Sequence, residues 1–188
     1  IPLTKATRIR QFTLGVPTVT YNEDGDADVS FAEDCVSPFY NRLEEFLLDE
    51  VPDENVVVFV DSQRFAAVVT ARLKKAGISA FEFSGQTRKD RMSNAEQFGT
   101  KYRAVVGVIA AIAEGFDGLQ KVSNNEVWLS SSTDETLNEQ GRGRNDRIGQ
   151  RKQVFRLELV DDLGLAEGRY STALEKRLVL NRSLRKAA

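Results

Sequence analysis

Three arginines lie within six consecutive positions of this sequence, at Arg142, Arg144 and Arg147. The surrounding stretch, residues 140–150, reads Gln-Gly-Arg-Gly-Arg-Asn-Asp-Arg-Ile-Gly-Gln. Guanidinium groups bind phosphate oxygens through forked pairs of N–H donors, and glycine lets a ligand come close to the backbone. Arg144 and Arg147 would share one face if this stretch ends a helix, because they are three residues apart. The pattern predicts a site for a phosphoryl group, and the alternative is a basic loop that faces only solvent.

The composition restricts the chemistry open to the chain. Its 188 residues suffice for one domain, with or without an appendage, and such a domain buries roughly 70% of its unfolded surface. Lysine and arginine number 26 against 28 aspartates and glutamates, so any nucleic-acid binding must be local. Histidine is absent, which removes Ser-His and Cys-His catalysis and the usual zinc sites.

Cysteine usage and hydropathy bear on the compartment. A single cysteine, Cys35, excludes an internal disulfide, fits a reducing compartment and is expected to be buried or inert. No apolar run approaches ~18 residues and the start lacks a signal-peptide pattern, so we expect no membrane span and a soluble, cytoplasmic protein. The first residue is Ile1 rather than Met, which suggests a piece of a longer protein.

Short apolar runs alternate with helical patterns along the chain, and parallel strands buried on both faces produce such runs. The alternation predicts an α/β fold, a doubly wound and mostly parallel sheet with helices on both faces. We expect a lead-in segment at residues 1–35, the main domain at 36–165 and a C-terminal helix at 166–188. Within the lead-in, two short extended pieces, 18–21 and 28–31, flank a turn. The predicted strands of the sheet are 56–60, 78–83, 104–109, 126–130 and 154–160.

Capping residues predict where the helices begin. The first two helices are expected to start at Ser37 and Ser62. The expected cap of the third is Thr87, and either Ser132 or Thr133 is expected to cap the helix that leads into the arginines. The third helix is expected to turn three apolar side chains inward: Met92, Ala95 and Phe98.

The segments that follow the strands are the expected ligand-binding positions, because ligands of open parallel sheets gather beyond the carboxyl ends of the strands. Small and hydroxylated residues there expose backbone amides that suit phosphate. Ordinary helix capping is the alternative for Ser62 and Thr87 taken singly. The candidate contacts to a nucleic-acid backbone are Ser62, Gln63, Arg64, Ser84, Gly85, Thr87 and Ala111.

The arginine stretch resembles motif VI of the superfamily 2 helicases, in particular the Swi/Snf-like DNA translocases. The pattern of that motif is Gln-Ala-x-Gly-Arg-x-x-Arg-Ile-Gly-Gln. Gly141 replaces the usual Ala, and Asp146 stands where the family commonly has His. Seven of eleven positions match: Gln140, Gly143, Arg144, Arg147, Ile148, Gly149 and Gln150.

Other segments follow the order of the same family. Residues 8–11 resemble the Leu-Arg-Gln lead-in to the second lobe, and residues 58–63 resemble motif IV. Ser84-Gly85 resembles the element that comes next, and residues 114–117 resemble motif V. The sequence departs from the family just before motif V, where Ile109-Ala110 and Ile112-Ala113 replace Ser-Thr and Gly-Gly.

The resemblance covers about residues 8–160 and implies the second RecA-like lobe of a two-lobed motor driven by ATP with Mg²⁺. It implies that Arg144 and Arg147 are catalytic arginine fingers. Gly115, Asp117 and Gln140 would contact the nucleotide together with these arginines. Asp117 either accepts ribose hydroxyls or simply forms a turn.

Two sequence features of a complete ATP site are absent. No Gly-x-x-x-x-Gly-Lys-Ser/Thr string occurs, and no Asp-Glu pair follows an apolar strand so as to hold magnesium. The chain is therefore expected to supply half of an ATP site and to be inactive alone, with the first RecA-like lobe of the same polypeptide holding most of the ATP and Mg²⁺. DNA, with double-stranded DNA favoured, is the second expected partner, and a phage or prophage DEAD-like helicase is a candidate source. A non-catalytic nucleic-acid-binding module and a protein-interaction domain remain alternatives.

Overall fold

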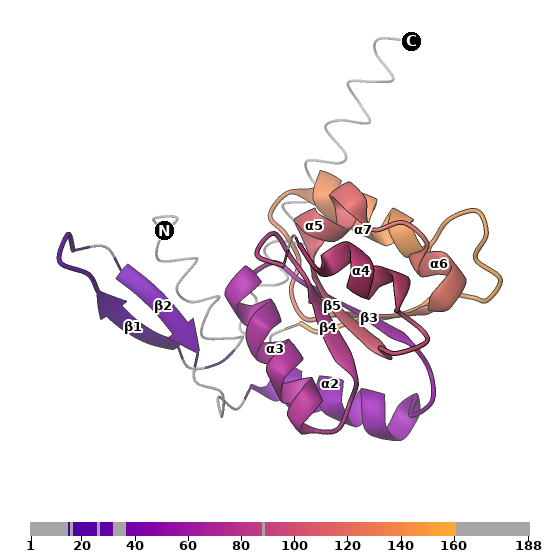
Figure 1. Cartoon of the computed structure of the whole chain (residues 1–188), viewed down its shortest axis with the longest axis horizontal. Helices are drawn as coiled ribbons and strands as arrows, with labels where there is room; N and C mark the ends of the chain where they lie inside the picture. The colour runs from indigo at the N-terminus through magenta and orange to yellow at the C-terminus, as the bar shows by residue number, and fades with distance from the viewer. Residues whose placement is uncertain (1–14, 16, 26, 32–36, 88, 161–188) are drawn as a thin grey trace, which may run out of the picture.

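The computed structural model describes residues 15, 17–25, 27–31, 37–87 and 89–160 of the chain (Figure 1). Within these residues, five parallel strands form the central sheet in the order β4-β5-β3-β6-β7. The prediction of a doubly wound parallel sheet is confirmed. The strands are β3 Val56–Val60, β4 Ala80–Phe83, β5 Ala104–Val108, β6 Asn125–Trp128 and β7 Phe155–Glu158.

Helices cover both faces of this sheet (Figure 1). The first group is α2 Pro38–Glu45, which continues as the π-helix η1 Phe46–Glu50, and α3 Gln63–Lys75. The opposite group is α4 Arg91–Glu96, α5 Ile109–Gly115, α6 Leu119–Val122 and α7 Glu135–Asn145. Right-handed crossovers place α3 on one face and α4 to α7 on the other. The chain moves toward one edge of the sheet from β3 to β4, and it moves toward the opposite edge from β4 through β5 and β6 to β7.

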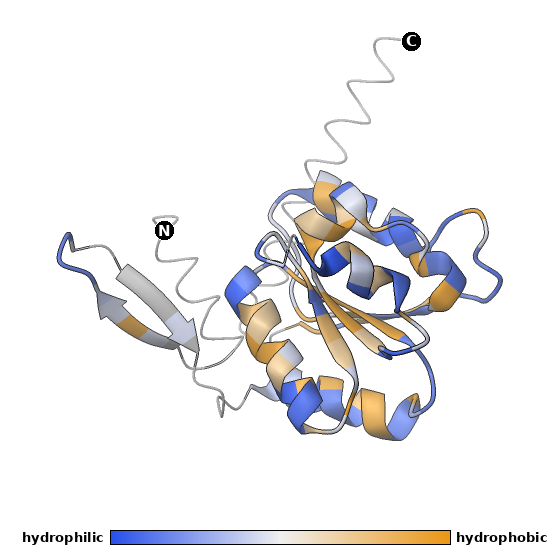
Figure 2. Cartoon of the chain, viewed as in Figure 1, coloured by the Kyte–Doolittle hydropathy of each residue, from blue (hydrophilic) through white to orange (hydrophobic). Residues whose placement is uncertain are grey.

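The core lies in the strands and the inner faces of the helices, which Figure 2 shows as the hydrophobic parts of the cartoon. Every residue of β3 and β5 is buried, because both faces of these central strands are covered. Phe59 stacks on Trp128 with 4.2 Å between ring centroids. Phe83 stacks on Phe116 at 4.5 Å, which fixes the loop after α5 against the end of β4.

A buried ion pair joins the two strands at one edge of the sheet. The side chain of Glu126 in β6 is fully buried, and its Oε2 accepts a hydrogen bond of 2.6 Å from Nε of Arg156 in β7. The indole Nε1 of Trp128 donates a second bond to the same oxygen over 3.1 Å. These two donors satisfy Oε2, as a buried carboxylate requires, whereas Oε1 is buried without a hydrogen-bond partner among the described residues. This pair fixes the register between β6 and β7.

The predicted extended pieces near the start of the chain form a β-hairpin. β1 Pro17–Tyr21 and β2 Ala27–Phe31 pair antiparallel. The turn is closed by a 3.0 Å bond from the backbone N–H of Gly25 to the carbonyl of Asn22, and Gly25 has φ +81°. In Figure 1 the hairpin lies beside α3 and apart from the central sheet.

The predicted start of α4 was wrong. The helix begins at Arg91 with Asp90 as its N-cap, and Met92 is 51% exposed. Thr87 instead closes the turn after β4, since its Oγ1 accepts from the backbone N–H of Ser84 and donates to the carbonyl of Glu82. With its donor and acceptor used there, the hydroxyl does not cap the later helix. Two of the three expected inward side chains do face the core, Ala95 partly and Phe98 almost fully.

The predicted cap of α7 was also wrong. Asp134 caps this helix, and its Oδ1 accepts a 2.9 Å bond from the backbone N–H of Thr136. Ser132 lies two residues earlier, where its Oγ accepts from the backbone N–H of Asp134 and its own N–H donates to Asn138. A run of Ser, Thr and Asp offers several candidate caps, and the carboxylate takes this position.

Some predictions fall outside the described residues, namely Cys35, the segment 8–11 and the C-terminal helix at 166–188. The domain boundaries at 35 and 165 therefore stay predictions. Across the part of the chain that the structure describes, no helix is both long enough and apolar enough to cross a bilayer.

Candidate functional site

The three arginines of residues 140–150 do not act alike. Arg142 belongs to the fold, because its Nη1 lies 2.8 Å from Glu135 Oε1 and its Nη2 lies 3.3 Å from Glu158 Oε1. Its guanidinium also lies 5.1 Å above the ring of Trp128. Burial acts to lower the pKa of Arg142, but the hydrogen bond to Glu135 and the neighbouring carboxylate charges outweigh burial and raise that pKa overall. This cation fastens α7 to β6 and β7.

Arg144 and Arg147 converge on one carboxylate. The Nη1 atoms of Arg144 and Arg147 lie 2.8 Å and 3.1 Å from the same oxygen, Oδ1 of Asp117. Arg144 lies within α7, whereas Arg147 lies just beyond its end, so a shared helix face does not bring them together. Instead, the loop after Asn145 turns Arg147 back toward Asp117 and so brings the two arginines together. The two guanidiniums therefore surround one anionic oxygen.

The two arginines differ in how firmly they are held. Arg144 also donates from Nε to the carbonyl of Ala113 over 3.0 Å, and its Nη2 donates to the same carbonyl. Its side chain is 23% exposed, against 43% for Arg147. Among the described residues, the bond to Asp117 is the one polar contact of the Arg147 side chain. Arg144 is thus fixed to α5, and Arg147 is the freer cation.

The position of Asp117 follows from how closely α5 packs on β5. The helix begins at Ile109 with no loop after the strand, because Gly107 leaves room for Ile112. A Cβ on Gly107 would lie 2.2 Å from Ile112 Cδ1, closer than real contacts allow. Gly118, with φ +92°, then turns the chain into α6. Asp117 therefore sits on the short loop between α5 and α6, with its side chain 79% exposed.

The predicted contacts after β3 and β4 lie together. Ser62 caps α3 by accepting from the backbone N–H of Phe65 over 3.4 Å, as expected from the sequence. A Cβ on Gly85 would lie 3.0 Å from Nε2 of Gln63, so the loops after the two strands touch. Ser84 is fully buried, and its hydroxyl bonds to the Glu82 carboxylate. These loops form one edge, at which Gln63, Arg64 and Gly85 are exposed.

The remaining predicted contacts occupy different environments. Ala111 is 6% exposed inside α5, so its side chain offers no surface to a nucleic acid. Gln140 is exposed on α7, and Gly115 is half-buried at the end of α5. Gly143, a matching position of the arginine stretch and not a predicted contact, is exposed and has nothing within 4 Å of the position of a Cβ. Their roles stay predictions.

One cation at this edge was missed by the sequence analysis. Arg91 opens α4, its guanidinium lies 5.2 Å above the ring of Phe83, and a Cβ on Gly115 would lie 4.0 Å from its Nη2. Its Nε is buried and has no hydrogen-bond partner among the described residues. The signal available in the sequence was an arginine shortly after a strand-end loop. Its placement between the loop after β4 and the end of α5 required the fold.

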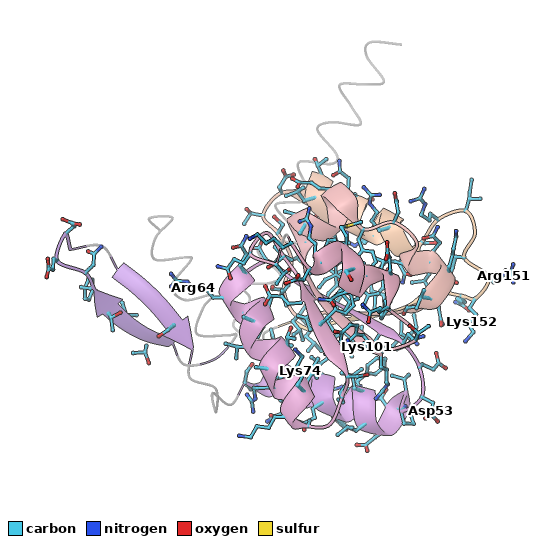
Figure 3. All side chains as sticks on the ribbon, viewed as in Figure 1. Asp53, Arg64, Lys74, Lys101, Arg151 and Lys152 are labelled. Atoms are coloured by element: carbon cyan, nitrogen blue, oxygen red, sulfur yellow. The ribbon has the colours of Figure 1, made fainter. Side chains whose placement is uncertain are left out.

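Exposed positive charge is otherwise spread out. In Figure 3, Arg64 and Lys74 project from α3, whereas Arg151 and Lys152 project from the loop after α7 at the right of the same view. The labelled lysines and arginines of this view do not gather into one patch.

Comparison with known proteins finds similarity in structure. No protein-family model matches the sequence, and no curated protein matches it at a significant level. The chain is similar to the C-terminal part of the Fun30 ATPase domain, with TM-score 0.61 and 19% identity over 71% of this chain and 43% of that chain. It is also similar to the Pyrococcus furiosus Hef helicase domain, with TM-score 0.56 and 20% identity over 74% of this chain and 29% of that chain.

The chain shares the α/β fold of the C-terminal part of the Fun30 ATPase domain and of part of the Hef helicase domain. At these identities the similarity concerns the fold, so the roles of individual residues rest on the geometry described above. The chain spans less than half of the length of either matched chain. The Swi/Snf subtype and the phage or prophage source stay predictions.

Proposed function

We propose that the chain is the second motor lobe of an ATP-dependent DNA helicase or translocase, in which Arg144 and Arg147 stabilise charge on the transferring phosphoryl group. The observation that carries this proposal is the convergence of both guanidiniums on one oxygen of Asp117, at 2.8 Å and 3.1 Å. A carboxylate oxygen resembles a phosphoryl oxygen in charge and in the donors that it accepts. The arrangement is suited to hold an oxyanion of phosphate.

The two arginines would divide the work. Arg144 is fixed by the carbonyl of Ala113, so it defines where the phosphoryl oxygen must lie. Arg147 is more exposed and has fewer partners, so it can follow the oxygen as charge builds up during transfer. An arginine finger of this kind typically contributes ~10³ to 10⁵ in rate. On this assignment Arg147 is the finger, and Arg144 sets the geometry.

The ATP itself would be held mainly by a first RecA-like lobe. The sequence has no Walker lysine and no Asp-Glu pair placed to hold Mg²⁺, and these groups normally cradle the nucleotide and its metal. Closure of the two lobes would bring Arg147 to the γ-phosphate, and reopening after hydrolysis would move the pair along DNA. Without that lobe the chain is expected to be inactive as an ATPase.

DNA would lie along the edge formed by the loops after β3 and β4. Gln63 and Gly85 are both exposed there, and the Gln63 side chain approaches Gly85. Arg91 is half-buried beside Gly115, where its Nη2 would lie 4.0 Å from a Cβ, whereas its Nε is buried and cannot reach a ligand. Backbone amides and arginines are common donors to nucleic-acid phosphates. Double-stranded DNA is the favoured substrate on the resemblance of the arginine stretch to the Swi/Snf-like translocases.

The test is ATP hydrolysis by the complete two-lobed protein carrying Arg147→Ala. Turnover is expected to fall ~10³-fold or more, while ATP affinity changes little because the first lobe holds the nucleotide. Arg151→Ala is the matched control, since this exposed cation lies four residues further along the same loop, and its turnover should equal that of the wild type. Unchanged turnover in the Arg147 variant would refute the assignment.

A second candidate function is nucleic-acid binding without hydrolysis, and the placement of Arg91 favours it. Binding through phosphate contacts weakens steeply with salt. If this function holds, Arg91→Ala weakens DNA binding and flattens its salt dependence, while the complete protein hydrolyses no ATP with or without DNA. DNA-stimulated hydrolysis would exclude this second candidate.

A further inference from the structure

Asp117 binds both arginines through a single oxygen, which the sequence did not predict. Its Oδ1 accepts from both guanidiniums, and the arginines come from positions 27 and 30 residues further along the chain. Among the described residues, neither Arg144 nor Arg147 has an ion pair with any other acidic group. One exposed carboxylate therefore neutralises part of the charge of both cations.

This contact contributes little to folding. The Asp117 side chain is 79% exposed and that of Arg147 is 43% exposed, and ion pairs in such positions have small net free energies. Two guanidiniums held around one point would, however, repel each other if no anion lay between them. The carboxylate keeps them converged at low cost and can leave easily when another anion arrives.

We infer that Asp117 is a placeholder for phosphate, an inference that rests on the proposed function. Its carboxylate occupies the position between Arg144 and Arg147 when no phosphoryl group is present. A phosphoryl oxygen and Asp117 both carry negative charge, so an incoming phosphate displaces the carboxylate. After hydrolysis Asp117 competes for the arginines again and favours release of inorganic phosphate. Asp117 thus acts through the arginines as a positioning residue.

The placeholder role differs from the ribose role in the sign of its effects. A carboxylate that competes with phosphate weakens binding of inorganic phosphate, which has no ribose. A carboxylate that accepts ribose hydroxyls strengthens binding of ATP and has no influence on inorganic phosphate. Inorganic phosphate is therefore the probe that separates the two roles.

The experiment is a titration of the 188-residue chain with inorganic phosphate, followed through the guanidinium Nε–H signals in NMR spectra. Asp117→Asn is expected to bind phosphate roughly tenfold more tightly than the wild type at low ionic strength, because two exposed ion pairs no longer have to break. Asp117→Asn combined with Arg147→Ala should lose this gain. Equal or weaker binding by Asp117→Asn, with an unchanged thermal transition, would overturn the inference.

Asp146→Asn is the matched control for a general charge effect. Asp146 is exposed, precedes Arg147 directly and has no ion pair among the described residues. Its replacement changes the net charge by the same amount as Asp117→Asn, yet phosphate affinity should rise by less than twofold. An equal gain in both variants would mean that net charge, and not the shared contact, controls binding, and the inference would fall.

The complete protein supplies the second readout. Asp117→Asn should make inorganic phosphate a stronger product inhibitor and should leave the preference for ATP over 2′,3′-dideoxy-ATP unchanged. A raised KM for ATP together with loss of that preference would assign Asp117 to the ribose. If the titration succeeds but Arg147→Ala leaves hydrolysis intact, the anion site stands and the motor assignment falls. If the titration fails and Arg147→Ala abolishes hydrolysis, the placeholder alone falls.

Discussion

Replacing Gly141 by alanine is expected to stabilise the chain, because this glycine lies inside α7 with its missing side chain directed into the core. A Cβ at Gly141 would lie 3.4 Å from Trp128, 3.5 Å from Phe59 and 3.7 Å from Ile109, which are ordinary contact distances. Alanine is a better helix former than glycine by about 1 kcal/mol. The added methyl group contributes up to about 0.8 kcal/mol through burial. The sum, up to about 1.8 kcal/mol, corresponds to a Tm increase of up to about 4 to 7 °C for a chain of this size.

Gly143 provides the matched variant on the same helix. Nothing lies within 4 Å of its Cβ position, so Gly143→Ala gains helix propensity without burial and should raise Tm by less than Gly141→Ala. Gly143 directly precedes Arg144 on the exposed side of α7, so a new side chain there would stand where the nucleotide approaches. Under the proposed function, Gly143→Ala lowers hydrolysis by the complete protein roughly tenfold or more through misplacement of the phosphoryl group. Gly141→Ala should leave hydrolysis unchanged.

Thermal unfolding and steady-state ATPase assays on the two variants check this reasoning. A lower Tm for Gly141→Ala would refute the packing of α7 against Trp128 and Phe59. An equal gain in Tm for both variants would show that burial of the added methyl group does not contribute to stability. Full hydrolysis by Gly143→Ala would show that no ligand comes close to this part of α7.

Three further predictions concern the fold that supports the site. Gly107→Ala should destabilise the chain by about 1 to 3 kcal/mol, measured by urea unfolding, because its Cβ would overlap Ile112; a neutral result would contradict the close packing of α5. Glu126→Ala should cost about 1 to 3 kcal/mol, because Nε1 of the buried Trp128 loses its acceptor, and an unchanged unfolding midpoint would contradict this contact. Burial and the nearby Glu44 raise the pKa of Tyr40 to about 12. The stability that its protonated phenol contributes is therefore complete below pH 10 and is lost as pH rises to about 12. Ultraviolet titration showing that Tyr40 ionises near pH 10 would contradict this prediction.

The sheet could be predicted because its strands are short runs of apolar residues buried on both faces. Val56–Val60 is such a run, and the structure places a strand at the same bounds. The start of α4 could not be predicted, because Thr87 can either cap a helix or close the turn after β4. In the structure its hydroxyl closes the turn. Met92 was assigned inward on the same mistaken helix, and it is exposed.

The candidate site was predicted in its parts but not in its contacts. The sequence indicated that Arg144 and Arg147 act together, and the resemblance of residues 114–117 to motif V singled out Asp117. The shared oxygen depends on the turn after Asn145 and on the close packing of α5, which are tertiary features. In the sequence Arg142 looked equivalent to Arg144 and Arg147. In the structure it pairs with carboxylates of α7 and β7, so its role is to stabilise the fold.

The central claim is that Arg147, converging with Arg144, stabilises the phosphoryl group during transfer. The most direct measurement compares the affinity of the complete protein for ADP with aluminium fluoride, which mimics the transferring phosphoryl group, and for ADP alone. The wild type should prefer the mimic, and Arg147→Ala should lose roughly 10³-fold of this preference while its ADP affinity stays the same. Equal preference in the wild type and the variant would contradict the claim.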